Sequence, residues 1–159
     1  WVGLDELCGA VLPRLRKLYP ATDVEMTLPA QLPLLHVNPA LIEQALYNVL
    51  ENAAKFNSPA YPIVLQAHMD ESRLCIDVSD HGPGIPAQDR HRVFDMFYSV
   101  ERGDHAGSSG TGLGLAICHG IIAAHNGAIE ALAGPDGQGT TIRIMLPVRN
   151  PPFDAAQDV

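Results

Sequence analysis

Hydrophobic residues recur at helical spacing in three long segments of the chain, and the residues at their ends mark where helices start or stop. Pro13 lies inside the first segment and is expected to bend or interrupt that helix. Asn38 and Pro39 form an N-cap followed by proline at the first helical position of the second. Asn126 and Gly127 supply a C-cap for the third. The predicted helices span residues 3–18, 38–56 and 112–125, with a short helix at 88–94.

Shorter runs of apolar or alternating residues predict strands between these helices. They span residues 24–28, 34–37, 63–68, 73–79, 128–133 and 140–146, and the last two form a hairpin. This order predicts a two-layer α/β sandwich, in which a mostly antiparallel mixed sheet of about five strands is covered on one face by about three helices. We expect residues 1–148 to form this domain and residues 149–159 to be a flexible C-terminal tail.

Composition narrows the classes of function. The net charge of −8 argues against broad nucleic-acid binding, which needs a basic face. Cys8, Cys75 and Cys118 lie in or beside apolar runs, so we expect buried, reduced thiols in a cytoplasmic domain. No stretch approaches the roughly 18 apolar residues that span a bilayer. Because the first residue is Trp1, we expect a longer parent protein whose remainder carries any membrane anchor.

Four polar residues of the second helix share one side of it. Asn48, Glu51, Asn52 and Lys55 follow the spacing i, i+3, i+4 and i+7, which lines them up along the helix axis. Two amides, a carboxylate and an ammonium group on one stripe can bind a hard metal ion together with phosphate oxygens. The alternative is a solvated helix face on which Glu51 and Lys55 form an i,i+4 ion pair.

An acidic residue and two glycines follow the strand predicted at 73–79. Asp80 can accept a hydrogen bond from an exocyclic amine at this position. Gly82 and Gly84 allow the backbone to approach a flat ring, because they carry no Cβ. The alternative is an ordinary tight turn.

The glycine-rich segment 107–115 (GSSGTGLGL) leads into the third long helix. Closely spaced glycines at a helix N-terminus present backbone N–H groups to an anion. The segment is not a Walker A loop, and Leu115 replaces the third glycine of a dinucleotide fingerprint. With the polar residues before it, it predicts a lid over 98–111, anchored by the packing of Phe94 and Phe97. The alternative is a flexible surface linker.

The order of these motifs resembles the catalytic domain of sensor histidine kinases, in the ATPase superfamily that includes DNA gyrase, Hsp90 and MutL. NVLENAAKF is similar to the N box, DHGPGIP to the G1 box, FDMF to the F box and GTGLGLAI to the G2 box. The resemblance covers nearly the whole chain and implies the Bergerat-type fold, with ATP and Mg²⁺ as cofactors. LPLLHVN, NVLENAAKF and LPVRNPP are more narrowly similar to potassium-responsive sensor kinases, which implies potassium or osmotic sensing.

The resemblance also implies a role for each matching position. Asn52 would coordinate Mg²⁺ between the ATP phosphates, with Asn48 supporting that site and Lys55 approaching the phosphates; these three are the implied catalytic residues. Asp80 would accept a hydrogen bond from the adenine N6 amine, and Thr140 would contact adenine through water. The implied nucleotide-binding positions are Asn48, Asn52, Lys55, Phe56, Asp80, Gly82, Gly84, Ile85, Phe97, Arg102, Gly110, Thr111, Gly112, Leu113, Gly114, Leu115 and Thr140.

The chain departs from the family pattern at three points. His81 replaces the usual asparagine of the G1 box. Ser99 stands where an arginine is common, which leaves Arg102 as the candidate for a contact between lid and phosphate. None of the seven histidines has the phosphoacceptor setting. The resemblance therefore implies an acceptor histidine on an upstream dimerisation domain, a homodimer in the full-length protein, a cognate response regulator, and an anchor in the bacterial inner membrane.

Three other functions share these motifs. Hydrolytic ATPases of the gyrase, Hsp90 and MutL type activate water with a glutamate one helical turn before the metal-binding asparagine. Asn48 occupies that place, and Glu51 is adjacent to Asn52, which favours a kinase. A regulatory module that has lost catalysis is a second alternative, although the N, G1 and G2 boxes are intact. A kinase that phosphorylates serine is the third.

Overall fold

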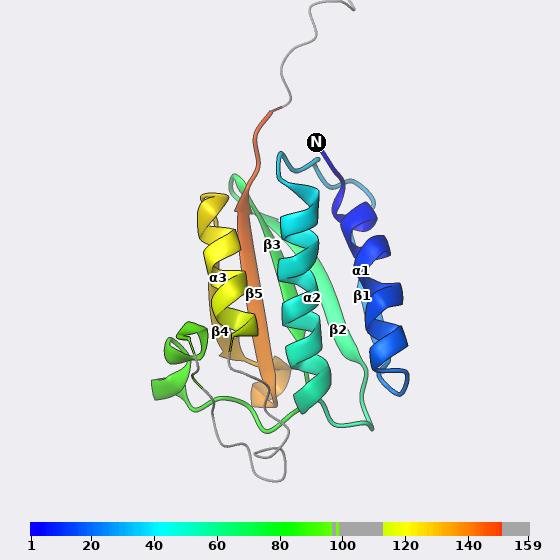
Figure 1. The fold of residues 1–159 in the computed structure, drawn as a ribbon, viewed down its shortest axis with the longest axis vertical. Helices are drawn as coiled ribbons and strands as arrows, with labels where there is room; N and C mark the ends of the chain where they lie inside the picture. Colours follow the sequence, from blue (N-terminus) through cyan, green and yellow to red (C-terminus); the bar gives the residue numbers. More distant parts are fainter. Residues whose placement is uncertain (97, 99–112, 151–159) are drawn as a thin grey trace, which may run out of the picture.

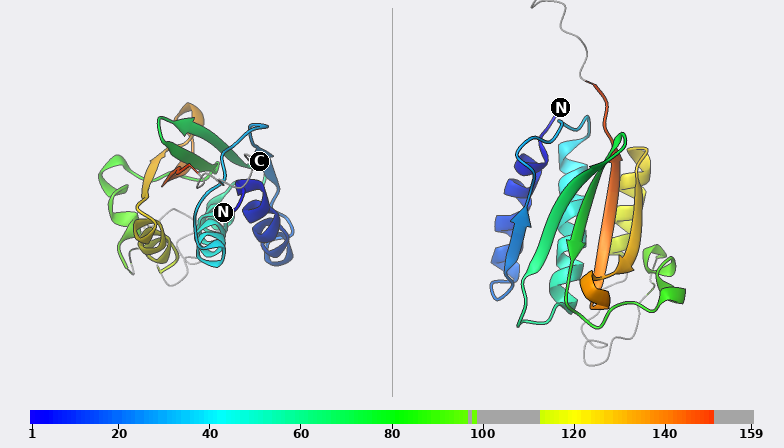
Figure 2. Two further views of the ribbon diagram at one scale, coloured as in Figure 1. Left: turned by 90° about the horizontal axis from the view of Figure 1, so that it is seen from above. Right: turned by 180° about the vertical axis from the view of Figure 1, so that it is seen from behind.

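The computed structural model describes residues 1–96, 98 and 113–150 of the 159-residue chain. Five strands form one sheet in the order β1-β2-β3-β5-β4, and three α-helices lie side by side on one of its faces (Figures 1 and 2). This arrangement confirms the predicted α/β sandwich. In chain order the elements are α1 (Leu4–Leu18), β1 (Val24–Thr27), α2 (Pro39–Phe56), β2 (Ile63–Asp70), β3 (Arg73–Ser79), the 3₁₀ turns η1 (Ala87–Asp89) and η2 (Arg92–Phe94), α3 (Gly114–Ala124), β4 (Ala128–Ala133), the 3₁₀ turn η4 (Pro135–Gly137) and β5 (Thr140–Pro147).

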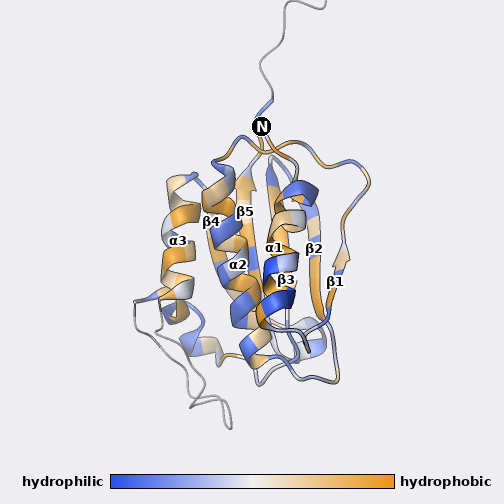
Figure 3. Ribbon diagram, turned by 45° about the vertical axis from the view of Figure 1, so that its right-hand side comes forward, coloured by the Kyte–Doolittle hydropathy of each residue, from blue (hydrophilic) through white to orange (hydrophobic). Residues whose placement is uncertain are grey.

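Strand β3 occupies the centre of the sheet and pairs antiparallel with β2 and β5. Strands β4 and β5 form an antiparallel pair, whereas β1 runs parallel to β2, so the sheet is mixed as predicted. Leu74, Ile76 and Val78 alternate along β3 and are at most 1% exposed. Leu46 and Leu50 of α2 are fully buried in the same core. Figure 3 shows the hydrophobic residues concentrated in the strands and on the inner sides of the helices.

The ends of α2 and α3 carry the predicted capping residues. Asn38 Oδ1 accepts a hydrogen bond from the backbone N–H of Leu41 at 3.2 Å, before the first turn of α2. Asn126 has a φ of +59°, in the left-handed region that commonly ends helices. The N–H of Gly127 donates to the carbonyl of Ile122 at 2.9 Å. Local sequence chemistry therefore sets both boundaries.

Pro13 does not interrupt the first helix, which was one of the two effects expected of it. Helix α1 runs without a break from Leu4 to Leu18. Proline removes the hydrogen bond to the carbonyl four residues earlier, which belongs to Gly9. Both Pro13 and Gly9 are exposed, so water can hydrate that carbonyl.

Two further local predictions are wrong. Residues 34–37 are not a strand: Leu35 forms a single antiparallel bridge with Val2, after which the chain enters the cap of α2. Residues 88–94 are not one helix but lie across the turns η1 and η2. These turns bury only Val93, so they lack the apolar face that would stabilise a longer helix.

Helices α2 and α3 run antiparallel, and three hydrogen bonds set their alignment. The bonds run from Asn48 Nδ2 to Gly114 O (3.1 Å), from Cys118 Sγ to Ala45 O (3.5 Å) and from Asn38 N to His125 Nε2 (3.1 Å). The start of α3 therefore lies beside the second half of α2. In Figure 1 the same end of the molecule holds the C-terminal end of α2, the end of β3 and the start of β5.

The three cysteines are free and buried, as expected from the apolar runs around them. Burial, with a smaller contribution from the charge of Asp5, raises the pKa of Cys8 to about 11. Burial alone raises the pKa of Cys118 to about 12. Both thiols are therefore protonated at neutral pH.

Within residues 1–96, 98 and 113–150, no helix is long and apolar enough to cross a membrane.

Candidate functional site

The segment after β3 turns sharply against the C-terminal end of α2. A side chain at position 82 would collide with the backbone carbonyl of Phe56, so only glycine fits there. Asn57, the residue that follows α2, accepts a hydrogen bond through Oδ1 from the N–H of His81 at 2.7 Å. These contacts bring Asp80 to the end of the helix that carries the polar stripe.

Asp80 is a buried carboxylate with 2% of its surface exposed. Its Oδ1 accepts hydrogen bonds from the N–H of Gly82 at 2.9 Å and from the N–H of Thr140 at 3.2 Å. The backbone N–H of Asp80 in turn donates to the carbonyl of Thr140 at 2.9 Å. Burial penalises an ionised carboxylate, and backbone donors offset this penalty. The Asp80 carboxylate, which the sequence predicted as a hydrogen-bond acceptor, is therefore held between the end of β3 and the start of β5.

Gly139 lies against Asp80 and was not singled out by sequence reasoning. It has a φ of +71°, and a side chain there would overlap the carbonyl of Asp80. Gly84 has a φ of +79°, and a Cβ on it would lie 3.1 Å from the carbonyl oxygen of Gly139. In the sequence, Gly139 is only a glycine at the end of a hairpin turn, and that position does not reveal its contact with Asp80.

The start of β5 adds a second buried polar group. Thr140 is 1% exposed, and its Oγ1 has no hydrogen-bond partner among the described residues. By contrast, the hydroxyls of Ser79 and Thr141 are 2.7 Å apart and satisfy each other. A buried hydroxyl without a partner costs free energy, so Thr140 Oγ1 suits a hydrogen bond to a ligand or to water.

His81, which departs from the family pattern, packs on an exposed tyrosine. The ring centroids of His81 and Tyr61 lie 4.5 Å apart with an interplanar angle of 15°. Asn57 Nδ2 donates to the carbonyl of Tyr61 at 2.8 Å, so one asparagine fixes both partners of the stack. The roles of Asn57 and Tyr61 could not be read from the sequence, because both depend on the return of the chain to α2.

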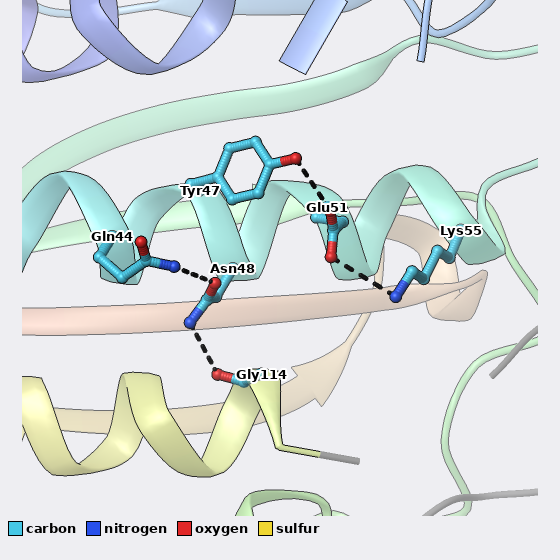
Figure 4. Close-up of polar contacts among 6 residues, drawn as sticks. All are labelled: Gln44, Tyr47, Asn48, Glu51, Lys55 and Gly114. Atoms are coloured by element: carbon cyan, nitrogen blue, oxygen red, sulfur yellow. Dashed lines mark hydrogen bonds and ion pairs between the residues drawn. The ribbon is translucent and has the colours of Figure 1, made fainter. Parts of the chain in front are cut away.

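Glu51 and Lys55 form the ion pair that the sequence predicted as one reading of the stripe. The Glu51 carboxylate lies 3.5 Å from Lys55 Nζ, and their side chains are 28% and 27% exposed. Glu51 also accepts a hydrogen bond from the Tyr47 hydroxyl at 2.9 Å (Figure 4). Burial and then the hydrogen bond to Glu51 raise the pKa of Tyr47 to about 12, so its hydroxyl stays a donor at neutral pH.

Asn48 connects α2 to α3 instead of facing the ion pair. Its Oδ1 accepts a hydrogen bond from Gln44 Nε2 at 2.7 Å, and its Nδ2 donates to the carbonyl of Gly114 at 3.1 Å (Figure 4). Both ends of the amide are therefore bonded. Gln44 is half-buried and was missed by sequence reasoning, since a glutamine inside a helix resembles an ordinary solvated position.

Asn52 lies one turn after Asn48, and its Nδ2 is buried without a hydrogen-bond partner in the described part of the chain. That part also contains no group of three His, Cys, Asp or Glu side chains that could hold a metal ion. Mg²⁺ in phosphate sites commonly takes one or two protein oxygens, with phosphate oxygens and water completing its coordination. The Nδ2 of Asn52 is a donor that suits a phosphate oxygen, and the amide oxygen of Asn52 is a ligand type that Mg²⁺ accepts, so Asn52 fits an ion held jointly with a phosphate ligand.

The other expected positions divide into core residues and residues outside the described ranges. Ile85 and Leu115 are 6% and 8% exposed and belong to the hydrophobic core, while Leu113 is half-buried. Phe94 packs near His119 of α3, with ring centroids 6.0 Å apart. The residues outside the described ranges are Phe97, Arg102, Gly110, Thr111 and Gly112, together with all of the expected 98–111 lid except Tyr98.

The chain belongs to the family of histidine kinase-, DNA gyrase B- and HSP90-like ATPases, whose model matches residues 37–150. It is 37% identical to the sensor protein KdpD of Escherichia coli (strain K12) over 153 residues, which cover 96% of this chain and 17% of KdpD. Its structure is similar to the mycobacterial sensor histidine kinase MprB, with a TM-score of 0.79 and 31% identity over 94% of this chain and 97% of that one. It also resembles full-length ShkA in complex with AMPPNP, with a TM-score of 0.78 and 27% identity over 98% of this chain and 32% of ShkA.

These similarities identify the chain as an ATP-binding catalytic domain of the sensor histidine kinase type. They confirm the family that the four sequence boxes predicted, and the likeness to potassium-responsive sensor kinases that LPLLHVN, NVLENAAKF and LPVRNPP predicted. The chain spans much less than two thirds of KdpD and of ShkA, and nearly the whole of the MprB structure.

We expect Gly139→Ala to destabilise the fold by about 1–3 kcal/mol, because alanine is strained at this φ and would press on the Asp80 carbonyl. Gly137→Ala is the matched control: its φ of +75° is also left-handed, but a Cβ there meets open space. Urea unfolding of both variants measures the difference. Equal losses of stability would show that the contact with Asp80 contributes nothing.

Proposed function

We propose that this chain binds Mg-ATP and transfers the γ-phosphoryl group to a histidine on a separate phosphoacceptor domain. The observation that carries this proposal is the gathering of complementary groups at one end of the molecule. Asp80 follows β3, Asn52 and Lys55 belong to α2, Thr140 starts β5 and Gly114 starts α3. Similarity to sensor kinases, and to ShkA in complex with AMPPNP, supports an adenine nucleotide as the ligand.

Asp80 and Thr140 suit the adenine base. A carboxylate has about four acceptor positions, so its bonds to the backbone N–H groups of Gly82 and Thr140 are compatible with a further bond to the base. The carboxylate would accept a hydrogen bond from the exocyclic amine of adenine, which guanine lacks at that position. The buried hydroxyl of Thr140 would bond to the base directly or through water. Gly82 and Gly84 leave the flat face of the base unobstructed.

Asn52 and Lys55 suit the phosphates. Asn52 would supply an amide oxygen to Mg²⁺, and the Lys55 ammonium would approach the phosphate oxygens. When bound, the metal neutralises phosphate charge and so assists phosphoryl transfer. Because the protein carries a net charge of −8, attraction to ATP must come from such local groups. Backbone N–H groups at the start of α3 add to it.

The surroundings of Asn52 favour transfer to an external acceptor over hydrolysis. The residue one turn before it is Asn48, and an amide cannot serve as the base that activates water. Glu51 is a carboxylate, but the Tyr47 hydroxyl and Lys55 already engage it. A module that binds nucleotide without transferring phosphate is the second candidate, and it is favoured if Mg-ATP binds but no acceptor becomes labelled.

For the whole protein we infer an upstream dimerisation domain that carries the acceptor histidine, a homodimer, and a cognate response regulator. Residues 1–148 would form the catalytic domain attached to it, on the cytoplasmic side of an anchored bacterial sensor. The resemblance to potassium-responsive kinases supports potassium or osmotic stress as the signal.

Replacing Asn52 tests the metal role. We expect Asn52→Ala to abolish the dependence of ATP affinity on Mg²⁺, whereas Asn52→Asp keeps an oxygen ligand and retains it. Titration calorimetry with and without Mg²⁺ measures the dependence, and thermal unfolding checks that both variants are folded. If folded Asn52→Ala binds Mg-ATP as the wild type does, the metal assignment is wrong.

Replacing Asp80 tests recognition of the base. The wild type should prefer ATP to GTP, because Asp80 only accepts hydrogen bonds. Asp80→Asn keeps an oxygen for the N–H groups of Gly82 and Thr140 but presents an amine to the base. We expect ATP affinity to fall by about 1–3 kcal/mol and the preference over GTP to shrink. An unchanged ratio of ATP to GTP affinity, measured by competition, would exclude the role in adenine recognition.

The transfer reaction is tested by supplying the acceptor. Alone, the chain should bind Mg-ATP without labelling itself or hydrolysing ATP rapidly. Mixed with the phosphoacceptor domain of its parent protein, it should label a histidine with an acid-labile, base-stable phosphate. Covalent linkage of the two domains should accelerate labelling, because it raises the local concentration of acceptor. Acid-stable label on serine or threonine would contradict the proposal, and rapid turnover by the chain alone would favour a hydrolytic ATPase.

A further inference from the structure

Two side-chain amides form a continuous hydrogen-bonded chain from the middle of α2 to the first residue of α3. Gln44 Nε2 donates to Asn48 Oδ1 at 2.7 Å, and Asn48 Nδ2 donates to the carbonyl of Gly114 at 3.1 Å. Figure 4 shows Asn48 between Gln44 and Gly114, turned away from the Tyr47–Glu51–Lys55 group. We name the chain Gln44–Asn48–Gly114 the amide relay.

The direction of the amide relay follows from the chemistry of its last member. A backbone carbonyl can only accept, so Asn48 must turn its Nδ2 toward Gly114. Its Oδ1 then faces Gln44, and of the two ends of the Gln44 amide only Nε2 can donate to it. The carbonyl of Gly114 thus orders both amides. In this orientation Asn48 Oδ1 accepts the hydrogen bond from Gln44. Oδ1 is also the only atom of the side chain that could coordinate a metal ion.

The amide relay also sets where the first turn of α3 begins. Asn48 meets Gly114, and one turn further along α3 the Cys118 thiol meets the carbonyl of Ala45, one turn earlier on α2. Because the helices are antiparallel, Asn52 and Lys55 lie on α2 beyond the point where α3 starts. A shift of Gly114 along α2 would therefore change the spacing between the start of α3 and these two residues.

We propose that Gln44 is a positioning residue, which acts through Asn48 to fix the start of α3 against the phosphate-binding part of α2. Asn48 then supports the metal site as a link between helices and is not itself a metal ligand. This inference rests on the proposed binding of Mg-ATP. It separates the two halves of the site: losing the amide relay weakens recognition of the phosphates and leaves recognition of adenine by Asp80 unchanged.

The test uses Gln44→Met in the 159-residue chain, since methionine is close in size, uncharged and helix-forming but cannot donate a hydrogen bond. Gln31→Met, the same change at an exposed glutamine before α2, is the matched control. Calorimetry measures affinity for Mg-ATP and for adenosine. Hydrogen exchange without nucleotide measures protection of the Ile117 N–H, which bonds to the Leu113 carbonyl at 2.9 Å in the first turn of α3. Amides of β3 serve as the folding reference.

We expect Gln44→Met to weaken Mg-ATP binding roughly threefold to tenfold, the usual effect of one lost hydrogen bond, with adenosine affinity unchanged. Exchange at Ile117 should accelerate, and Gln31→Met should alter neither quantity. In an Asn48→Leu background, Gln44→Met should have no further effect on Mg-ATP binding, because the amide relay is already broken.

Parallel losses of ATP and adenosine affinity would overturn the proposal, since they indicate a general structural role for Gln44. Additive effects of Gln44→Met and Asn48→Leu would overturn it too, because Gln44 would then act independently of Asn48. If the wild type bound neither Mg-ATP nor adenosine, the proposed function would be wrong. Hydrogen exchange at Ile117 would then be the test of whether Gln44 positions α3 through Asn48. In that case faster exchange at Ile117 supports the relay and unchanged exchange refutes it.

Discussion

A single buried carboxylate holds together the segments that form the site. Asp80 cannot leave water without donors, and two of its donors come from different parts of the chain: Gly82 in its own turn and Thr140 on β5. The reciprocal bond from Asp80 N–H to Thr140 O continues the β3–β5 pairing for one more residue. Gly82 then brings this turn against the last carbonyl of α2. The position of the polar stripe of α2 relative to Asp80 therefore follows from the hydrogen bonds that the buried Asp80 carboxylate requires.

The glycines around Asp80 are explained by this constraint before any ligand is considered. Position 82 faces the Phe56 carbonyl and position 139 faces the Asp80 carbonyl, and neither leaves room for a Cβ. From the sequence, Gly82 was interpreted as allowing the backbone to approach a flat ring. Here the backbone packing of three segments already requires glycine at both positions, and a flat open surface for a base is a consequence of that packing.

Sequence was most informative where a feature is local. The caps at Asn38 and Asn126, the bounds of α2 and the strand pairs β2–β3 and β4–β5 all follow from residues close together in the sequence. The Glu51–Lys55 ion pair is likewise a matter of helical spacing. The strand expected at 34–37 failed because its apolar residues pack as a single bridge with the N-terminus instead of joining the sheet.

The candidate site was predictable as a set of motifs but not as a set of contacts. Gly139 and Gln44 were missed because each depends on a contact that only tertiary structure defines. Gly139 packs against the Asp80 carbonyl, and Gln44 bonds to the Asn48 amide, which Gly114 orients. Neither residue is unusual in its own segment. Asn48 was singled out, yet its orientation depends on a carbonyl 66 residues away.

The charges of α2 show how an acidic protein can still attract an anion at one point. Lys55 is paired with Glu51, which would cancel its charge if the pair were isolated. Glu51 shares its carboxylate with the Tyr47 hydroxyl, and Tyr47 in turn lies under the Arg14 guanidinium, 4.1 Å from the ring centroid. The negative charge of Glu51 is therefore shared between the Tyr47 hydroxyl and the Lys55 ammonium. The Lys55 side chain is 27% exposed, so we expect a phosphate group to be able to approach its ammonium without displacing Glu51.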